Sequence, residues 1–549
     1  MVRRFLILAC LLLAFVALET GAADAPQAAP DSDKELLEQG RLLYQTGLRP
    51  DGSAVPAVVH RDVVLPAGAG ACISCHRRSG IGVAEGGATR SLNLTANALF
   101  APTDKPPIRP AYDYDSLVRA MKTGIVPGGR VLDPIMPLYD LSAIEARALV
   151  AYLGQLGNEA SAGVSDTDIQ LGMVLAPDAS ASEREAALAV AQRWVEIKNA
   201  ESRRESKRAA ASNRHYYGRS MQRAFRTWQL HVLTLEGSET EWPAQLQKFY
   251  NEVSPFAMVA GAAGPGWPVI DQFCEQFEVP CILPLTEFAP PGEPGFYSLY
   301  FSSGITLEAA VIARHLQDSK LAPRAKILIL YPDDVAGPVT LMSLRKKLLD
   351  TGFSNIAAVP VRVDKPFSAQ AWDGLLRSEQ AQVMISLIPT NTLSGMVAQS
   401  RDSDNLPGAI YTAASSSDWA SNSGIPAALF ERIRHVYPYT LKEPGHVQFP
   451  REAVWLKSQG LSDLDPLAAS KTLFALKALG MGLMDIQSNF SGAYLLEMFE
   501  HSLDGTRLTS LFPKTSLGPD QRYLARGAWV ARLSGNPDAL FTGAIWVQP

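Results

Sequence analysis

Cysteine is scarce in this sequence, with five among 549 residues. Cys10 lies in the apolar stretch near the amino terminus, and the other four form two close pairs, Cys72 with Cys75 and Cys274 with Cys281. Apart from Cys10, no thiol is left outside a pair. This usage is expected of a chain that works in an oxidising compartment, where a loose thiol is a liability.

Long uncharged segments are also scarce. The run from Phe5 to Leu18 carries no charge, follows a short basic start and precedes a polar exit of small residues. It is too short to cross a bilayer comfortably. The pattern therefore predicts a cleaved signal peptide over residues 1–23, a periplasmic location, and no membrane span in the mature protein. Acylation at Cys10 is a weaker alternative, because more leucines follow it.

Signatures of several other function classes are missing. A net charge of −5 on a mixed composition argues against nucleic acid or membrane as a general partner. The sequence contains no nucleophile–base constellation, no second set of metal ligands and no flavin fingerprint. We therefore predict no catalytic residues, and an enzyme is the weakest functional hypothesis.

The stretch Cys72-Ile73-Ser74-Cys75-His76 carries the most specific chemistry. Two thiols at this spacing can form thioethers with haem, and the adjacent histidine can then bind the iron. Glycine-rich flanks argue against a thioredoxin-like pair, and a zinc site lacks ligands because the only other histidine nearby is His60. We predict one covalent haem c on Cys72 and Cys75, with His76 as an axial iron ligand.

The second axial ligand is predicted to be Met136, in a loop that Pro134 and Pro137 hold extended. Met121 and His60 are the rivals, but Met121 falls in a predicted helix and His60 in a loop. Iron with histidine and methionine on its two sides has no open position, which suits electron transfer. The single CxxCH excludes a familiar dihaem peroxidase.

Three helices are predicted around this motif. The first follows a capping box at Ser32–Glu35 and closes at Gly47, the second covers Asp115–Lys122, and the third runs from a capping box at Ser142–Glu145 to Gly157. A glycine inside a helix is costly. Gly40 therefore predicts a close approach between the first and third helices.

Residues 32–157 resemble a class I c-type cytochrome domain. The resemblance rests on the first helix, the CxxCH, the Met136-Pro137 loop and a final helix containing Ala151-Tyr152-Leu153. It implies a small all-α domain with haem attached at Cys72 and Cys75, His76 as the proximal ligand and Met136 as the distal one. Residues 158–168 are small and polar, and we predict a linker there.

From residue 169 to the end, short apolar runs alternate with helical segments. The runs cover residues 169–175, 229–235, 256–261, 281–285, 326–331, 357–363, 383–388, 409–413 and 433–436. Helical segments include residues 182–200, 265–277, 306–317, 338–350 and 368–376. Such alternation predicts an α/β fold with parallel sheets covered on both faces, and the number of units predicts two Rossmann-like lobes.

This part resembles a type I periplasmic solute-binding protein of the branched-chain (Leu/Ile/Val) amino acid receptor family. The matching segments are Val259–Gly264, Val279–Pro284, Tyr297–Ser303 and Lys326–Asp334. The resemblance implies a ligand cleft lined by loops at strand carboxyl ends. The candidates are Gly264, Trp267, Thr286, Glu287, Tyr300, Ser302, Asp334, Asn391, Ser415 and Asp418. Structural roles compete: core packing for Trp267, hinge packing for Tyr300 and helix capping for Asp334.

Two features depart from that family. The loop Ala262–Trp267 lacks the small hydroxyl residues that usually hold an amino-acid carboxylate. The stretch Glu201–Arg226 is strongly basic, which predicts either a solvated helix face or a docking surface for an acidic redox partner. Cys274 and Cys281 flank a helix-to-strand connection, and we predict a structural disulfide between them.

Together these features predict an exported cytochrome that carries electrons to or from a periplasmic dehydrogenase or a respiratory cytochrome or oxidase. Its solute-binding-like domain recognises a small organic ligand or a partner dehydrogenase. The alternative is an ABC-type solute receptor in which the haem acts as a redox or ligand sensor.

Overall fold

The computed structural model describes residues 33–82, 91–103, 108–157, 162–211, 226–290, 295–400, 405–416, 426–430, 432–440, 451–486, 489–503, 511–518, 521–533 and 541–549. The predicted signal peptide and part of the predicted linker lie outside these residues. The chain divides into two compact units, Met1–Asn158 and Glu159–Pro549. We refer to them as unit 1 and unit 2.

Unit 1 is mainly helical. Its helices are α1 (Asp33–Thr46), α2 (Ile73–His76), α3 (Ala96–Leu99), α4 (Tyr114–Thr123) and α5 (Ala143–Gln155). It also has an antiparallel sheet in the order β2-β1-β3, formed by Val63–Val64, Ala57–Val59 and Leu138–Tyr139. The expectation of an all-α domain was therefore wrong in this respect: two loop segments far apart in sequence pair their backbones. The three predicted long helices are present.

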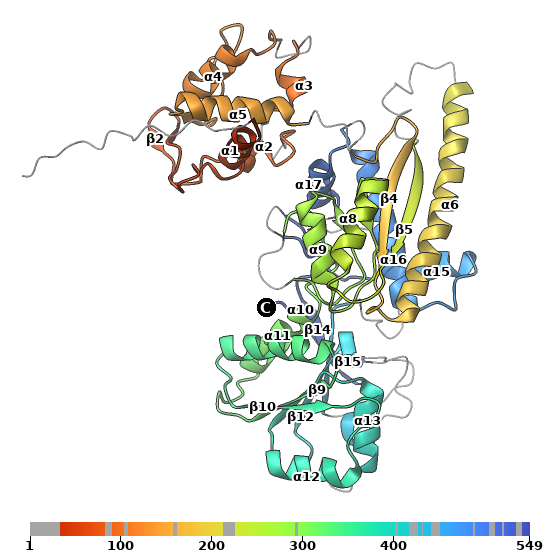
Figure 1. Ribbon diagram of the computed structural model, residues 1–549. Helices are drawn as coiled ribbons and strands as arrows, with labels where there is room; N and C mark the ends of the chain where they lie inside the picture. The colour runs from red at the N-terminus through yellow and green to blue at the C-terminus, as the bar shows by residue number, and fades with distance from the viewer. Residues whose placement is uncertain are drawn as a thin grey trace, which may run out of the picture. The chain divides into compact units, whose positions relative to one another are not determined.

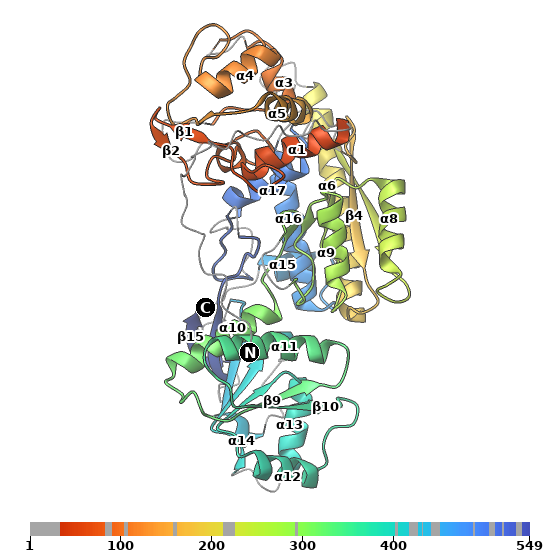
Figure 2. The same cartoon turned by 60° about the vertical axis from the view of Figure 1, so that its left-hand side comes forward.

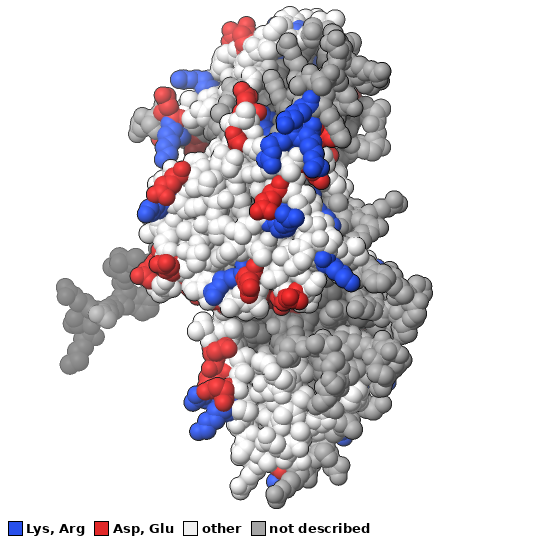
Figure 3. Space-filling view, turned by 90° about the vertical axis from the view of Figure 1, so that its right-hand side faces the viewer, with Lys and Arg blue, Asp and Glu red and all other residues white. Residues whose placement is uncertain are grey.

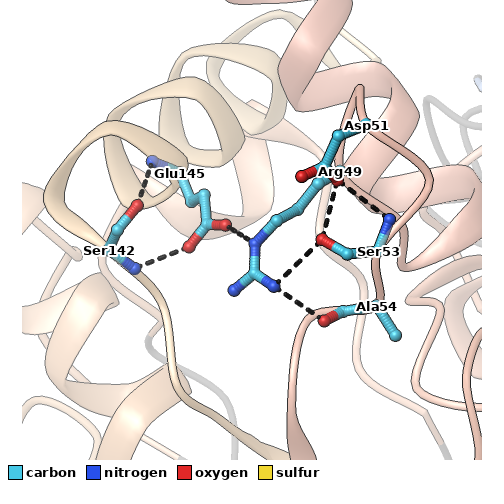
Figure 4. Close-up of polar contacts among 6 residues, drawn as sticks. All are labelled: Arg49, Asp51, Ser53, Ala54, Ser142 and Glu145. Atoms are coloured by element: carbon cyan, nitrogen blue, oxygen red, sulfur yellow. Dashed lines mark hydrogen bonds and ion pairs between the residues drawn. The ribbon is translucent and has the colours of Figure 1, made fainter. Parts of the chain in front are cut away.

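The packing of α1 on α5 fixes the frame of unit 1. A Cβ added to Gly40 would lie 2.1 Å from the carbonyl oxygen of Ala148, so the two backbones approach as closely as the sequence predicted. The predicted capping box of α5 is formed by Ser142 and Glu145. The same Glu145 carboxylate accepts a hydrogen bond from Arg49, which ties the loop after α1 to the start of α5 (Figure 4).

Substituting Gly40 with alanine should destabilise unit 1 by about 1–3 kcal/mol, because the new methyl group overlaps the Ala148 carbonyl. Gly154 is the matched control inside α5, since its nearest neighbour to an added Cβ is 4.0 Å away. Gly154→Ala should raise stability by up to about 1 kcal/mol. Denaturant unfolding of both variants measures this difference, and equal effects would contradict the close crossing.

Unit 2 contains two lobes, each built on one sheet (Figure 1). Lobe 1 has a fully parallel sheet in the order β5-β4-β6-β7-β8. These strands are Thr227–Thr234, Asp168–Leu175, Ala257–Val259, Cys281–Ile282 and Ser298–Leu299. Its helices are α6 (Ala181–Ala211), α8 (Trp242–Val253), α9 (Trp267–Gln276), α15 (Arg451–Ser458), α16 (Pro466–Asp485) and α17 (Gly492–Ser502).

Lobe 2 has the strand order β10-β9-β11-β12-β13-β14-β15. The strands are Ile356–Val361, Ile327–Pro332, Val383–Ser386, Ala409–Ala413, Ile433–Tyr437, Ala528–Leu533 and Phe541–Val547. The first five are parallel as predicted, whereas β14 and β15 are antiparallel additions. Its helices are α10 (Ile305–Asp318), α11 (Ala336–Asp350), α12 (Ala369–Glu379), α13 (Thr390–Gln399) and α14 (Ala427–Phe430).

Both faces of each sheet are covered by helices, as Figure 2 shows for α11 and α12 in lobe 2. Alternate residues of β9 point to opposite faces of the lobe 2 sheet. Ile327 and Ile329 pack in the cluster that contains Leu344 of α11, and Leu328 packs in the cluster that contains Trp372 of α12. This period-two burial is the physical basis of the apolar runs in the sequence.

Among the described residues, the segments 300–304, 437–440, 511–518 and 521–525 link the two lobes. The first and last are joined by hydrogen bonds from the Tyr300 amide to the Arg522 carbonyl (2.8 Å) and from the Ala525 amide to the Phe301 carbonyl (2.8 Å). The Thr440 amide donates to the Leu511 carbonyl at 2.7 Å. The hinge of unit 2 is therefore hydrogen-bonded along its backbone.

Helix α16 is long and apolar enough to cross a membrane by length and composition. However, 78% of its most apolar window is buried inside the protein. It packs against α6, α15 and α17. We interpret α16 as a core helix of lobe 1.

Candidate functional site

The CxxCH motif of unit 1 lies on one helical turn. Cys72 occupies the position before α2, and the His76 amide donates to the Cys72 carbonyl at 2.9 Å. Both thiols are free; Cys72 is partly buried against the core of unit 1 and Cys75 is exposed. The two sulfurs and the imidazole are therefore presented by a single short element.

The imidazole of His76 is buried, with 5% of the residue exposed. Its Nδ1 lies 2.8 Å from the carbonyl oxygen of Leu92. A carbonyl can only accept, so Nδ1 carries the proton and Nε2 keeps its lone pair. Burial lowers the pKa of His76, which favours the neutral ring. A neutral imidazole whose second nitrogen is held by a carbonyl is the state in which histidine binds metals.

Two competing uses of the cysteines fit less well. Burial raises the pKa of Cys72 to about 11, so it is a thiol, whereas a catalytic redox pair needs a lowered thiol pKa. Within the described residues, no group of three or more His, Cys, Asp or Glu could hold a metal ion. The described part of unit 1 thus provides no tetrahedral zinc set around the motif.

Met136 lies in a turn in which its amide donates to the Asp133 carbonyl at 2.9 Å and the Ile135 amide donates to Asp133 Oδ1 at 3.0 Å. Its side chain is partly buried against the core of unit 1. Met121 is a core residue of α4, and His60 is an exposed loop residue with a positive φ of 52°. Two free thiols, one neutral imidazole and one thioether are a donor set that fits a covalently attached haem.

In lobe 1, several predicted cleft residues turn out to be structural. Trp267 is buried, and its indole donates to the hydroxyl of Tyr300 at 3.0 Å. Tyr300 in turn donates to Asp271. Trp267 and Tyr300 both belong to the buried cluster that contains residues of β6 and α9, so each has a structural role. A gap beside them, lined by Met258 and Pro284 among others, is too small to admit a water molecule.

Five other predicted residues make local backbone contacts. Thr286 accepts from the Phe288 amide (3.1 Å), Ser302 from the Gly304 amide (3.1 Å), Asp334 from the Gly337 amide (2.9 Å) and Asn391 from the Thr392 amide (2.5 Å). A Cβ on Gly264 would lie 2.6 Å from the Asp178 carbonyl oxygen, so this glycine permits close loop packing. Asp418 lies outside the described residues.

The structure does bring two predicted residues, Glu287 and Ser415, into one polar cluster. It adds Glu308, Tyr439 and Lys471, which the sequence analysis missed. Lys471 Nζ donates to Glu287 Oε1 at 2.8 Å, and Glu308 accepts from the Ser415 amide at 3.0 Å and from the Ser415 hydroxyl. We name Glu287, Glu308, Ser415, Tyr439 and Lys471 the hinge cluster.

The hinge cluster lies where ligands of open α/β sheets are expected. Glu287 follows β7, Ser415 follows β12 and Tyr439 follows β13, so the cluster collects residues from the carboxyl ends of strands in both lobes. Lys471 comes from the core helix α16 and Glu308 from α10. Lys471 and Glu308 could have been found from the sequence, because each is a charged residue within an apolar stretch of helix. A charged side chain is seldom buried in such a stretch unless it is paired.

Lys471 is a buried cation with several partners. Its ammonium lies 5.3 Å from the ring centre of Tyr439 and 5.8 Å from that of Phe301. Burial alone lowers the pKa of Lys471, but the neighbouring Glu287 and Tyr439 outweigh it and raise the pKa overall. Lys471 is therefore charged, and Glu287 is its counterion.

Glu308 is almost fully buried. Burial, followed by the charge of Glu287, raises its pKa to about 8, although the hydrogen bonds from Ser415 act in the opposite direction. A protonated carboxyl can donate to the Ser415 hydroxyl and still accept from the Ser415 amide. Glu308 therefore changes its protonation within the near-neutral pH range.

The predicted disulfide is not formed in this structure: Cys274 and Cys281 are both free and buried. The two thiols are in hydrogen-bond contact, and burial is the main cause that raises the pKa of Cys274. A thiol in that state is a poor nucleophile for disulfide exchange. Both cysteines lie in a buried apolar cluster of lobe 1, and the disulfide between them stays a prediction.

Part of the predicted basic surface is visible. Arg203, Arg204 and Lys207 are exposed on α6, and Lys and Arg side chains gather toward the end of this helix (Figure 3). The segment 212–225 lies outside the described residues. Arg226 departs from the prediction because it is buried, donates to the Ser165 carbonyl and lies 4.4 Å above the ring of Phe490.

Comparison with family models and with curated proteins gives no match. Among solved structures, the chain is similar to a fatty acid ABC transporter substrate-binding protein from Thermomonospora curvata (14% identity, 71% of this chain and 93% of that one, TM-score 0.48). It is also similar to a solute-binding protein from Rhodopseudomonas palustris in complex with 3,4-dihydroxybenzoic acid (12%, 69% and 97%, 0.47). A leucine-binding protein from Thermotoga maritima is a further neighbour (12%, 68% and 98%, 0.46).

Stability of unit 2 should fall as the pH rises from about 4.5 to about 8. Folded unit 2 retains a proton on Glu308 over this window, whereas the unfolded chain releases it near 4.5, the ordinary pKa of a glutamate carboxyl. Glu308→Gln should flatten this dependence and stabilise the protein at pH 8 by a few kcal/mol. Glu252→Gln, at an exposed pair on α8, is the control that should keep the wild-type slope. Identical slopes in all three proteins would show that Glu308 is ionised throughout.

Proposed function

We propose that this chain is an exported electron carrier with one covalent haem in unit 1 and a receptor for a small organic ligand in unit 2. Cys72 and Cys75 would hold the haem, and His76 and Met136 would bind its iron. The observation that carries the proposal is the buried neutral imidazole of His76, whose Nδ1 is fixed by the Leu92 carbonyl beside two free thiols. When bound, such a group supplies one-electron chemistry.

The rest of unit 1 holds the motif in place. Tyr44 of α1, fully buried, donates to the Arg77 carbonyl at 2.7 Å. Tyr139 of β3 donates to the Gly70 carbonyl at 2.8 Å. These two hydroxyls clamp the backbone on both sides of the CxxCH, so the thiols and the imidazole keep a fixed relation to the α1–α5 frame. The expected partners are a periplasmic dehydrogenase and a respiratory cytochrome or oxidase.

The receptor part rests on the two-lobed architecture of unit 2. Strand carboxyl ends of both sheets converge at the hinge cluster, where Glu287 and Ser415 are contributed by different lobes. A small molecule bound there would contact both lobes and restrict the hinge segments. This architecture also favours a second candidate function, a solute receptor for an uptake system whose haem reports redox state.

Replacing the proposed distal ligand should open one face of the iron. Met136→Ala is expected to give a reduced protein that binds carbon monoxide readily, whereas the wild type should not. Met121→Leu is the matched control, since Met121 is a buried core residue of α4. Absorption spectra of the reduced proteins with and without carbon monoxide test this prediction.

The outcomes separate the candidates. A wild-type spectrum that does not respond to carbon monoxide supports the carrier. Ready binding by the wild type favours the sensor. If Met136→Ala behaves as the wild type and Met121→Leu does not, the ligand assignment is wrong.

A further inference from the structure

The lobe 1 side of the proposed ligand site is apolar and closely packed. Ala262 and Ala263 follow β6 and are buried, and their amides already donate to the carbonyls of Val174 (2.8 Å) and Leu285 (3.3 Å). Gly264 has no room for a side chain, because a Cβ would meet the Asp178 carbonyl. This loop thus carries no hydroxyl, and its Ala262 and Ala263 amides are already bonded within the protein.

The carboxylate of Glu287 is already neutralised. It pairs with Lys471 at 2.8 Å, and the two side chains are 26% and 8% exposed. A ligand ammonium at Glu287 would have to displace Lys471 and leave that buried cation without its counterion. Removing one partner of a buried ion pair is strongly unfavourable. A ligand carboxylate at Lys471 would meet the same obstacle from Glu287.

The second buried acid is also occupied. Glu308 is 4% exposed, and its two oxygens are bonded to the Ser415 amide and hydroxyl. The exposed carboxylates of Asp178 and Asp334 accept from the amides of Gly266 (2.7 Å) and Gly337 (2.9 Å). Each of these two exposed carboxylates therefore already accepts one hydrogen bond from a backbone amide.

Apolar and neutral groups are also partly exposed at these strand ends among the described residues. Phe288 follows Glu287, Tyr331 lies near the end of β9, and Ala414 follows β12. The hydroxyl of Ser415 can also accept a hydrogen bond. Such a lining suits a ligand with an apolar body and one neutral polar group, which the Ser415 hydroxyl would bind.

We propose that the ligand of unit 2 is an uncharged organic molecule with an apolar body and a hydroxyl or carbonyl group; this inference rests on the proposed receptor function. The Glu287–Lys471 pair acts as the specificity determinant, because the two side chains neutralise each other's charge without a ligand. A zwitterion or an ion could pair with the buried charge of Glu287, Lys471 or Glu308 only by displacing a partner inside the protein.

Calorimetric titration of the full-length protein with matched probes tests the inference. Isoamyl alcohol, isovalerate, isoamylamine and leucine share one branched frame, and benzyl alcohol, benzoate, benzylamine and phenylalanine share another. In each set the alcohol should bind at least about tenfold more tightly than the three charged members.

Two variants sharpen the test. Lys471→Met removes the counterion of Glu287, so the preference should move at least about tenfold toward the amine. The double variant Glu287→Gln with Lys471→Met is neutral again and should restore preference for the alcohol. Circular dichroism confirms folding of each variant, and the wild-type ranking decides the question even where a variant fails to fold.

The outcomes are distinguishable. Tighter binding of leucine, isovalerate or isoamylamine by the wild type would overturn the inference and leave the receptor function standing. Absence of binding by every member of both sets would count against the receptor function and the inference together.

Discussion

The proposed haem site of unit 1 depends on one hydrogen bond, from Nδ1 of His76 to the carbonyl of Leu92. It fixes the tautomer and the orientation of a buried ring, and it leaves Nε2 with a lone pair and no proton. The close α1–α5 crossing at Gly40 and the clamps from Tyr44 and Tyr139 hold the surrounding backbone. Without that bond the ring could rotate, and the CxxCH would present two thiols but no oriented ligand.

Unit 2 depends in a comparable way on the pair formed by Lys471 and Glu287. A buried ammonium on a core helix is costly unless it is paired, and its partner comes from the loop after β7. Tyr439 on a crossing segment completes its surroundings. The ion pair of Lys471 thus links α16, in the core of lobe 1, to the hinge. The same pair limits which charged ligands the proposed site can accept.

Local signals in the sequence predicted much of the fold. The capping box of Ser142 and Glu145 located the start of α5, and apolar runs located the parallel strands of both lobes. Contacts between residues far apart in the sequence could not be predicted from these local signals. Lys471 and Glu287 are 184 residues apart, and the antiparallel β14 and β15 form only because the chain returns to lobe 2. Trp267 and Tyr300 were placed at the ligand site because their positions follow strands, yet their mutual hydrogen bond buries them in the core.

The proposed function requires that Cys72 and Cys75 carry a covalent haem. The most direct test is the intact mass and absorption spectrum of the mature wild-type protein, produced in a host that attaches haem to exported cytochromes. We expect a mass larger than that of the polypeptide by one haem, with the spectrum of low-spin, methionine-ligated iron. A colourless protein whose mass equals that of its amino acids alone would contradict it.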